Sequence, residues 1–248
     1  MGASVQGRKI VITGASRGLG RALAIVAASQ GALPILLGRS LDALQEVSDT
    51  ISSNGGPRAD SFVCDLSSPR SIASAVNKIA MMHPDIDVLV NNGAQFTTGS
   101  LEDHTDEQIM AVVNSAVSGT MILTRELLPL LKARARADIH NVVSMSGLPY
   151  ARFVGASLPF RAAKAAQDGF TQGLVEELQG SSIRITSIYP GIIEDVSPVT
   201  ADWQRQRGID EGLTNKEVVD AIIYALSAPA NVSLRQIVIE RTRSDFLS

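Results

Sequence analysis

Short apolar runs rich in valine, isoleucine and leucine alternate along the chain with longer segments whose apolar residues recur every three or four positions. The short runs are typical of parallel strands that are buried on both faces, and the longer segments are typical of amphipathic helices. We predict strands at residues 9–12, 33–37, 61–64, 87–90, 139–144, 183–188 and 236–240. We predict helices at about residues 19–30, 41–51, 66–82, 106–132, 159–179 and 215–227.

The regular alternation of strand and helix defines the expected fold class. It predicts an α/β protein with a doubly wound parallel sheet of Rossmann type, helices on both faces and right-handed crossovers. No repeat, low-complexity segment or linker interrupts the pattern, so we expect residues 1–248 to form a single domain. In such a sheet a ligand binds beyond the carboxyl ends of the strands.

Composition narrows the expected partners. The chain is 45% hydrophobic and 19% charged with a net charge of −3, which gives no reason to expect nucleic acid or an anionic membrane as partner. No apolar run reaches the roughly 20 residues of a membrane span, and no signal-peptide pattern is present. Cys64 is the single cysteine, which excludes an internal disulfide and favours a reducing compartment, so we expect a cytoplasmic protein. The scattered His83, His104 and His140 predict no metal site.

The segment TGASRGLG, residues 13–20, lies between the first predicted strand and the first predicted helix. Its glycines, Gly14, Gly18 and Gly20, have the spacing GxxxGxG. Glycines let the backbone approach a phosphate closely, and a helix N-terminus offers free N–H groups and the positive end of its dipole. The segment therefore indicates a nucleotide site, with a plain tight turn as the alternative.

The second predicted strand is followed by Arg39 and Ser40, with no acidic residue. An acid at this point binds the ribose 2′-hydroxyl of NAD, whereas an arginine accommodates the 2′-phosphate of NADP. Arg39 therefore favours NADP(H), and Arg17 in the glycine segment can reach the same charge, unless both face solvent. Asp65, after the third strand, is expected to accept a hydrogen bond from the adenine amino group, or else to cap the following helix.

Taken together, these motifs resemble the short-chain dehydrogenase/reductase superfamily over about residues 7–243. Other residues that match the family pattern are Asn114, Lys164, Pro190-Gly191 and the segment NNGA at 91–94, where the family usually has NNAG. The resemblance implies a seven-stranded sheet, hydride transfer between a nicotinamide and a carbonyl or alcohol carbon, and a homodimer or homotetramer built on the two long helices. The predicted cofactor contacts are Gly14, Ser16, Arg17, Gly18, Leu19, Gly20, Arg39, Ser40, Asp65, Leu66, Asn91, Gly93, Lys164, Pro190, Gly191 and Ile193.

The chain departs from the family at both positions that handle the substrate oxygen. In the family a tyrosine phenol beside a lysine exchanges the proton, a serine polarises the oxygen, and an asparagine holds a water. Here Lys164 and Asn114 are retained, but Phe160 stands at the tyrosine position of the Tyr-x-x-x-Lys motif. The serine expected thirteen residues earlier falls on Gly147, although a bulge could bring Ser146 into that role. A phenyl ring has no proton to give.

The substrate side of the predicted site includes a loop at about residues 192–214. Tyr150, after the fifth strand, is better placed than Tyr189 to replace the lost phenol, although it could serve only as a wall of the pocket. Phe96 and Phe153 are further expected walls, which suggests an apolar or aromatic small-molecule substrate.

The same loop carries a third departure from the family. Five positions after Pro190 the family often has a threonine that touches the cofactor, and this chain has Asp195. Because an acid beside the pyrophosphate is unfavourable, we expect the loop to follow another course or to direct Asp195 at the substrate.

Two functions fit these observations. The first is an NADP(H)-dependent oxidoreductase with an atypical active site, which reduces an imine, an iminium or a conjugated C=C bond rather than a simple ketone. The second is an altered homologue that binds NADP(H) but acts as a non-redox enzyme or as a partner subunit. The complete set of cofactor motifs favours the first.

Overall fold

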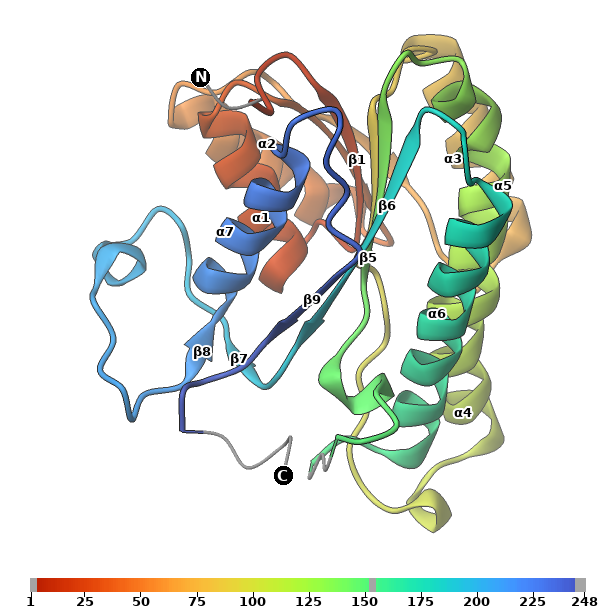
Figure 1. Ribbon diagram of the computed structural model, residues 1–248, viewed down its shortest axis with the longest axis vertical. Coiled ribbons are helices and arrows are strands. Elements are labelled where there is room, and N and C mark those ends of the chain that lie inside the picture. The colour runs from red at the N-terminus through yellow and green to blue at the C-terminus, as the bar shows by residue number, and fades with distance from the viewer. Residues whose placement is uncertain (1–3, 152–154, 244–248) are drawn as a thin grey trace.

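A seven-stranded parallel sheet is the centre of the computed structural model, which describes residues 4–151 and 155–243 (Figure 1). The strand order is β3-β2-β1-β4-β5-β6-β9. A separate pair of two-residue parallel strands, β7 and β8, lies beyond the sheet. The strand bounds are β1 Lys9–Thr13, β2 Leu33–Gly38, β3 Asp60–Val63, β4 Val88–Asn91, β5 Ala137–Val142, β6 Ile183–Pro190, β7 Ile193–Glu194, β8 Leu213–Thr214 and β9 Gln236–Ile239.

Helices cover both faces of the sheet (Figure 1). Helices α1, α2 and α7 lie on one face, and α3, α5 and α6 lie on the other. The helix bounds are α1 Gly18–Ser29, α2 Leu41–Ser53, α3 Pro69–Met82, α4 Asp106–Val113, α5 Gly119–Lys132, α6 Leu158–Glu177 and α7 Asn215–Leu226. Shorter helical turns are η1 Leu101–Asp103, η2 Asn114–Ser118, η3 Met145–Gly147 and η4 Ala201–Gln204.

Strand β1 shows why the apolar runs form buried strands. Successive side chains of a strand point to opposite faces, so Ile10 and Ile12 join the core beneath α1 and α7, while Val11 joins the core beneath α3 and α5. All three side chains are fully buried. The predicted fold class, a doubly wound seven-stranded parallel sheet with helices on both faces, is thereby confirmed.

Two predicted elements differ from the structure in ways that affect the site. The predicted helix at 106–132 contains a π-helical turn, η2, between α4 and α5. Such turns interrupt the regular helix spacing and are frequent at functional sites. The predicted strand at 139–144 ends at Val142, and the next residues form the tight turn η3 instead.

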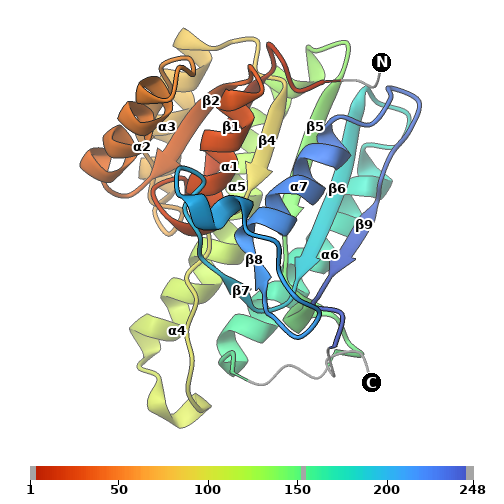
Figure 2. The same ribbon diagram turned by 90° about the vertical axis from the view of Figure 1, so that its left-hand side faces the viewer.

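The loop between β7 and β8 lies over the start of α1 and beside α7 (Figure 2). Its Trp203 is only 6% exposed and packs into the core that α1 and α7 share. Among the residues that the structure describes, no helix has the length and apolar character needed to cross a membrane.

Candidate cofactor and active site

The turn from β1 into α1 adopts a conformation that requires glycine. Gly14 and Gly18 have φ values of +66° and +57°, which side chains of L-residues rarely allow. A Cβ at Gly20 would lie 2.4 Å from the carbonyl oxygen of Gly14. The glycine spacing is therefore a steric requirement of the turn, and it leaves the N-terminus of α1 open to a ligand.

Hydrogen bonds hold the residues after β4 against the turn between β1 and α1. The hydroxyl of Thr13 accepts hydrogen bonds from the backbone N–H groups of Asn92 and Gly93 at 2.9 and 2.8 Å. The Asn92 side-chain amide donates to the Thr13 carbonyl oxygen at 2.9 Å. A Cβ at Gly14 would lie 2.9 Å from the Cα of Gly93, so this close backbone contact requires glycine at position 14.

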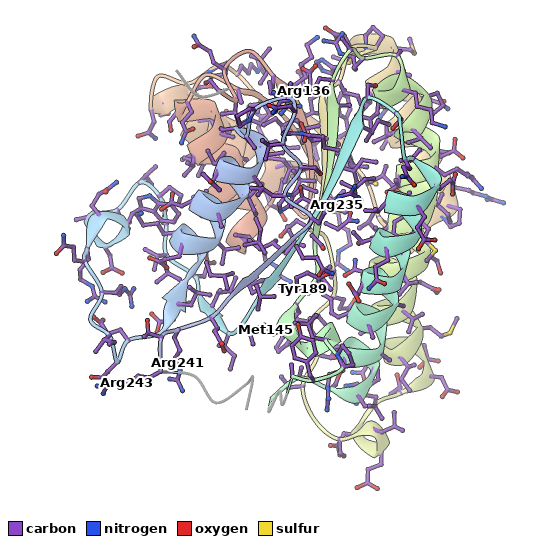
Figure 3. All side chains as sticks on the ribbon, in the orientation of Figure 1. Arg136, Met145, Tyr189, Arg235, Arg241 and Arg243 are labelled. Atoms are coloured by element: carbon purple, nitrogen blue, oxygen red, sulfur yellow. The ribbon has the colours of Figure 1, made fainter. Side chains whose placement is uncertain are left out.

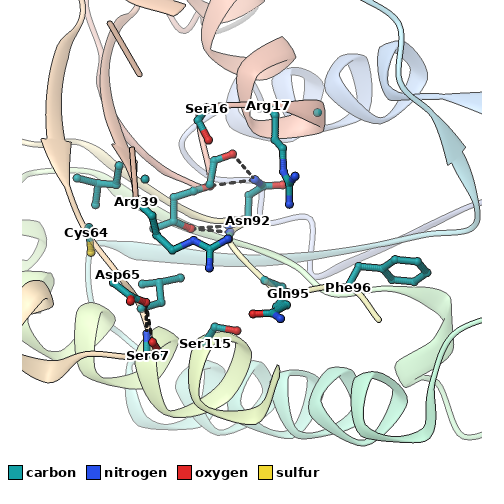
Figure 4. Close-up of a pocket in the computed structure, with 18 of the residues that line it drawn as sticks. Ser16, Arg17, Arg39, Cys64, Asp65, Ser67, Asn92, Gln95, Phe96 and Ser115 are labelled. Carbon is teal, nitrogen blue, oxygen red and sulfur yellow. Dashed lines mark hydrogen bonds between the residues drawn. The ribbon is translucent and has the colours of Figure 1, made fainter. Parts of the chain in front are cut away.

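A cleft of about 500 Å³ opens at the carboxyl ends of β1, β2, β3 and β4. Figure 4 shows Arg17 and Arg39 extending into it, with Asp65 towards one end and Phe96 towards the other. The predicted cofactor residues that line it are Gly14, Ser16, Arg17, Gly18, Leu19, Arg39, Asp65, Leu66 and Gly93. The cleft thus gathers the glycine turn and the two arginines, as the sequence predicted.

Other predicted contacts lie outside the cleft lining. Ser40 is the N-cap of α2, where its hydroxyl accepts from the Ala43 N–H, and Asn91 is buried and donates to Thr124 and Asn141. Gly20 packs against Gly14, as described above. The remaining predicted residues that do not line the cleft are Asn114, Ser146, Tyr150, Lys164, Pro190, Gly191 and Ile193.

Several lining residues were not among the predicted cofactor contacts. They are Thr13, Leu37, Gly38, Cys64, Ser67, Asn92, Ala94, Gln95, Phe96, Ala111 and Ser115, of which only Phe96 was predicted near the substrate. Most follow directly on a strand, so their positions at strand ends could have identified them. Burial, with a contribution from Asp65, raises the pKa of the Cys64 thiol to about 12, so this thiol stays protonated in the cleft.

Asp65 does not cap helix α3. Its carboxylate accepts from the backbone N–H and the hydroxyl of Ser67 at 2.9 and 2.7 Å, and Ser68 is the N-cap of α3. The capping alternative is therefore wrong, and Asp65 faces the cleft with its carboxylate oriented by Ser67 (Figure 4).

Lys164 on α6 is buried, with 3% of its surface exposed. Its ammonium donates to the Val142 carbonyl oxygen at 2.9 Å and to the side-chain oxygen of Gln167 at 2.7 Å. Burial lowers the pKa of Lys164 to about 7. Both of these acceptors are neutral, so neither offsets the cost of burying this charge.

Phe160 lies one helical turn before Lys164 and is also buried. The Lys164 Nζ is 5.5 Å from the centre of the Phe160 ring, and Phe96 of the cleft packs edge-on against the same ring with 5.0 Å between ring centres. The aromatic pair therefore connects the cleft to Lys164, and it presents carbon where a tyrosine would present a hydroxyl.

Two buried serines follow β5. The Ser146 hydroxyl donates to the Ser144 hydroxyl at 3.0 Å, within the η3 turn. The assignment of Gly147 as a replaced serine stays a prediction, and the local packing opposes it. A Cβ at Gly147 would lie 2.7 Å from the backbone carbon and oxygen of Lys164, which leaves no room for a side chain.

The remaining predicted active-site residues, one asparagine and three aromatic residues, differ in burial and in their neighbours. Asn114 begins the π-helical turn η2, next to Ser115 of the cleft lining. Tyr150 is 59% exposed, and Phe153 lies outside the described residues. Tyr189 is buried beside Met145, and its hydroxyl donates to Asp168 (Figure 3).

Burial, together with the hydrogen bond to Asp168, raises the pKa of Tyr189 to about 12. A phenol that is already committed to a carboxylate, and that ionises less readily than usual, is poorly suited to proton exchange. Of the two tyrosines, Tyr150 has the more accessible hydroxyl.

The loop at 192–214 keeps Asp195 near the glycine turn. The Asp195 carboxylate accepts from the Asn215 side-chain amide at 2.8 Å. Its other oxygen lies 4.0 Å from the position that a Cβ on Gly18 would occupy. The loop therefore keeps this acid near Gly18 without placing it in the cleft lining, and the expectation that Asp195 is directed at the substrate stays a prediction.

The sheet, its crossovers and the cleft at its carboxyl edge define an α/β protein of the Rossmann type. A family model for the short chain dehydrogenases matches residues 8–208, and the chain belongs to this family. A relative from Staphylococcus saprophyticus, called an uncharacterized oxidoreductase, is 28% identical over 95% of this chain and 97% of its own.

Solved structures show the same fold. A metagenomic short-chain oxidoreductase in complex with NADP is 25% identical, with a TM-score of 0.79 over 95% of this chain and 98% of that one. The L-sorbose reductase of Gluconobacter frateurii, complexed with NADPH and L-sorbose, is 22% identical, with a TM-score of 0.84 over 98% of this chain and 100% of that one.

Proposed function

We propose that this protein is an NADP(H)-dependent oxidoreductase. The glycine turn supports this proposal, because Gly14 and Gly18 line the cleft at the start of α1, where backbone N–H groups can approach a diphosphate. The metagenomic relative in complex with NADP has the same fold and is 25% identical. When bound, the nicotinamide supplies or accepts a hydride.

The preference for NADP(H) rests on Arg17 and Arg39. Both side chains line the cleft, on the loops that follow β1 and β2 (Figure 4). A guanidinium group binds a phosphate through charge-assisted hydrogen bonds, whereas the ribose hydroxyl of NAD would need an acid at this place. We assign to Asp65, which lines the same cleft, the role of accepting a hydrogen bond from the adenine amino group.

The reaction class follows from Phe160, the observation that carries the proposal. Its buried ring separates Lys164 from Phe96 of the cleft, and no hydroxyl is present at this point to protonate a substrate oxygen. Loss of a general acid costs about 10²–10⁴ in rate. An iminium carbon accepts hydride without proton delivery, and an activated alkene can take its proton from water, so we assign substrates of these two classes.

We assign the polarising role to the serines that follow β5. Ser144 and Ser146 are both buried and hydrogen-bonded to each other, and they follow Val142, whose carbonyl oxygen accepts from Lys164. This pair takes the place that the sequence analysis gave to position 147. Phe96 and the exposed Ile192 favour an apolar or aromatic substrate.

The test is NADPH oxidation, followed at 340 nm, with a panel of ketones, cyclic imines and enones. We expect turnover with imines or enones and little with ketones. Tight NADPH binding without oxidation of any substrate would favour the second candidate, a non-redox protein that retains the cofactor site. Absence of NADPH binding would contradict both.

A further inference from the structure

Asp195 is held in place by a buried side chain. Asn215, at the start of α7, is 1% exposed, and its amide donates both to the Asp195 carboxylate and to the Val196 carbonyl oxygen. Its oxygen accepts from the Val196 backbone N–H at 3.0 Å. The buried amide therefore anchors the segment at 195–196, and its hydrogen bond to the carboxylate holds the exposed Asp195 side chain near α1.

This carboxylate lies against the start of α1. Gly18 lines the main cleft and also a smaller cavity of about 130 Å³, which Asp195 and Arg21 line as well. One oxygen of Asp195 lies 4.0 Å from the position of a Cβ on Gly18. The positive end of the α1 dipole therefore faces a carboxylate as well as the cleft.

No basic side chain neutralises this carboxylate directly. Within residues 4–151 and 155–243, no lysine, arginine or histidine nitrogen lies within 4.0 Å of the Asp195 oxygens, whereas the neighbouring Glu194 pairs with Arg207 at 2.7 Å. Arg21 shares the small cavity with Asp195 but forms no ion pair with it, so the carboxylate charge is left to act on a ligand at the start of α1.

We propose that Asp195 weakens the binding of the dinucleotide by opposing its diphosphate, and so sets the affinity of this site for the cofactor. The proposal rests on the function proposed above, because it needs a dinucleotide at the glycine turn. Two negative groups that share the end of one helix repel each other, and the hydrogen bond from Asn215 favours the position of the carboxylate near that end.

The expected size of the effect is modest and depends on salt. A repulsion across several ångströms of partly solvated space corresponds to about a fivefold to tenfold loss of affinity. Salt screens such a repulsion, because the Debye length falls from about 10 Å at 0.1 M to about 3 Å at 1 M.

The experiment measures the dissociation constant of NADPH for the wild type and for Asp195→Asn at low salt and at 1 M salt. The asparagine keeps an oxygen that can accept from Asn215, so the loop stays anchored while the charge is lost. We expect Asp195→Asn to bind NADPH about fivefold to tenfold more tightly than the wild type at low salt. At 1 M salt we expect the two dissociation constants to differ by less than about twofold. The matched control is Asp202→Asn, which removes a charge from the same loop where it pairs with Arg205 and should leave the affinity within about twofold.

Binding of a second ligand, adenosine 2′-monophosphate, distinguishes failure of this proposal from failure of the proposed function. Adenosine 2′-monophosphate has no diphosphate, so Asp195→Asn should leave its affinity unchanged. Equal NADPH affinity of the wild type and Asp195→Asn at low salt would overturn this proposal and leave the proposed function intact. Failure of both proteins to bind NADPH and adenosine 2′-monophosphate would overturn the proposed function, and this proposal with it.

Discussion

At the scale of single residues, the phenyl ring of Phe160 changes what the neighbouring lysine can do. Lys164 has no phenol beside it to activate, and its ammonium donates to Val142 and Gln167 instead. An ammonium group has three donors, so one remains for a ligand. That this lysine holds a cofactor hydroxyl stays a prediction, because Lys164 does not line the cleft, while the proton that a ketone would need has no donor at position 160.

Arg39 is the residue on which the cofactor preference depends most. We predict that Arg39→Asp weakens NADPH binding at least about thirtyfold, because a charge-assisted bond to the 2′-phosphate is replaced by repulsion, and changes NADH affinity less than about threefold. Isothermal titration calorimetry with NADPH and with NADH measures the two affinities. Arg70→Asp on the exposed surface of α3 is the control. Equal losses for the two cofactors would remove the assignment to NADP(H).

At the scale of the elements, the end of β5 and the start of α6 decide the geometry of the active site. The turn η3 packs its Gly147 directly on the backbone of α6 at Lys164. This contact brings Ser144 and Ser146 next to the helix that carries Phe160 and Lys164. Gly147 thus allows close packing between η3 and α6. The hydroxyl groups of this turn belong to Ser144 and Ser146.

We predict that Gly147→Ser destabilises the protein by about 1–3 kcal/mol and does not create ketone reduction, because the new side chain collides with backbone atoms. Thermal unfolding measures the loss. The control is Gly169→Ser on α6, where a Cβ meets no atom within 4 Å, so its unfolding temperature should not fall. A stable Gly147→Ser variant that gains ketone reduction would restore position 147 as that of the missing serine.

At the scale of the whole molecule, the fold was predictable because it follows from local pattern. Apolar runs such as Ile10–Ile12 must be buried on both faces, and the helices between them require parallel strands. The glycine turn and the two arginines were predictable for the same reason, because they lie at fixed places relative to the ends of strands.

The side-chain networks of the site were less accessible from the sequence. Gln167 lies one helical turn after Lys164, so helix spacing could have identified it as a partner. Asn215 lies twenty residues from Asp195 in another element, and no spacing rule pairs them. The collision at Gly147 likewise depends on how a turn meets a distant helix, which only the assembled fold reveals.

The most direct test of the proposed chemistry compares one cyclic imine with the ketone of matching ring size, for the wild type and Phe160→Tyr. We predict that the wild type reduces the imine with a kcat/KM at least about 10²-fold above that for the ketone, because the basic imine nitrogen takes its proton from water and reacts as the iminium, whereas the ketone oxygen needs the missing acid. The tyrosine variant should raise the ketone value at least about tenfold and leave the imine value within about threefold. Equal reduction of both substrates by the wild type, with no gain from the tyrosine, would contradict a reductase adapted to work without a phenol.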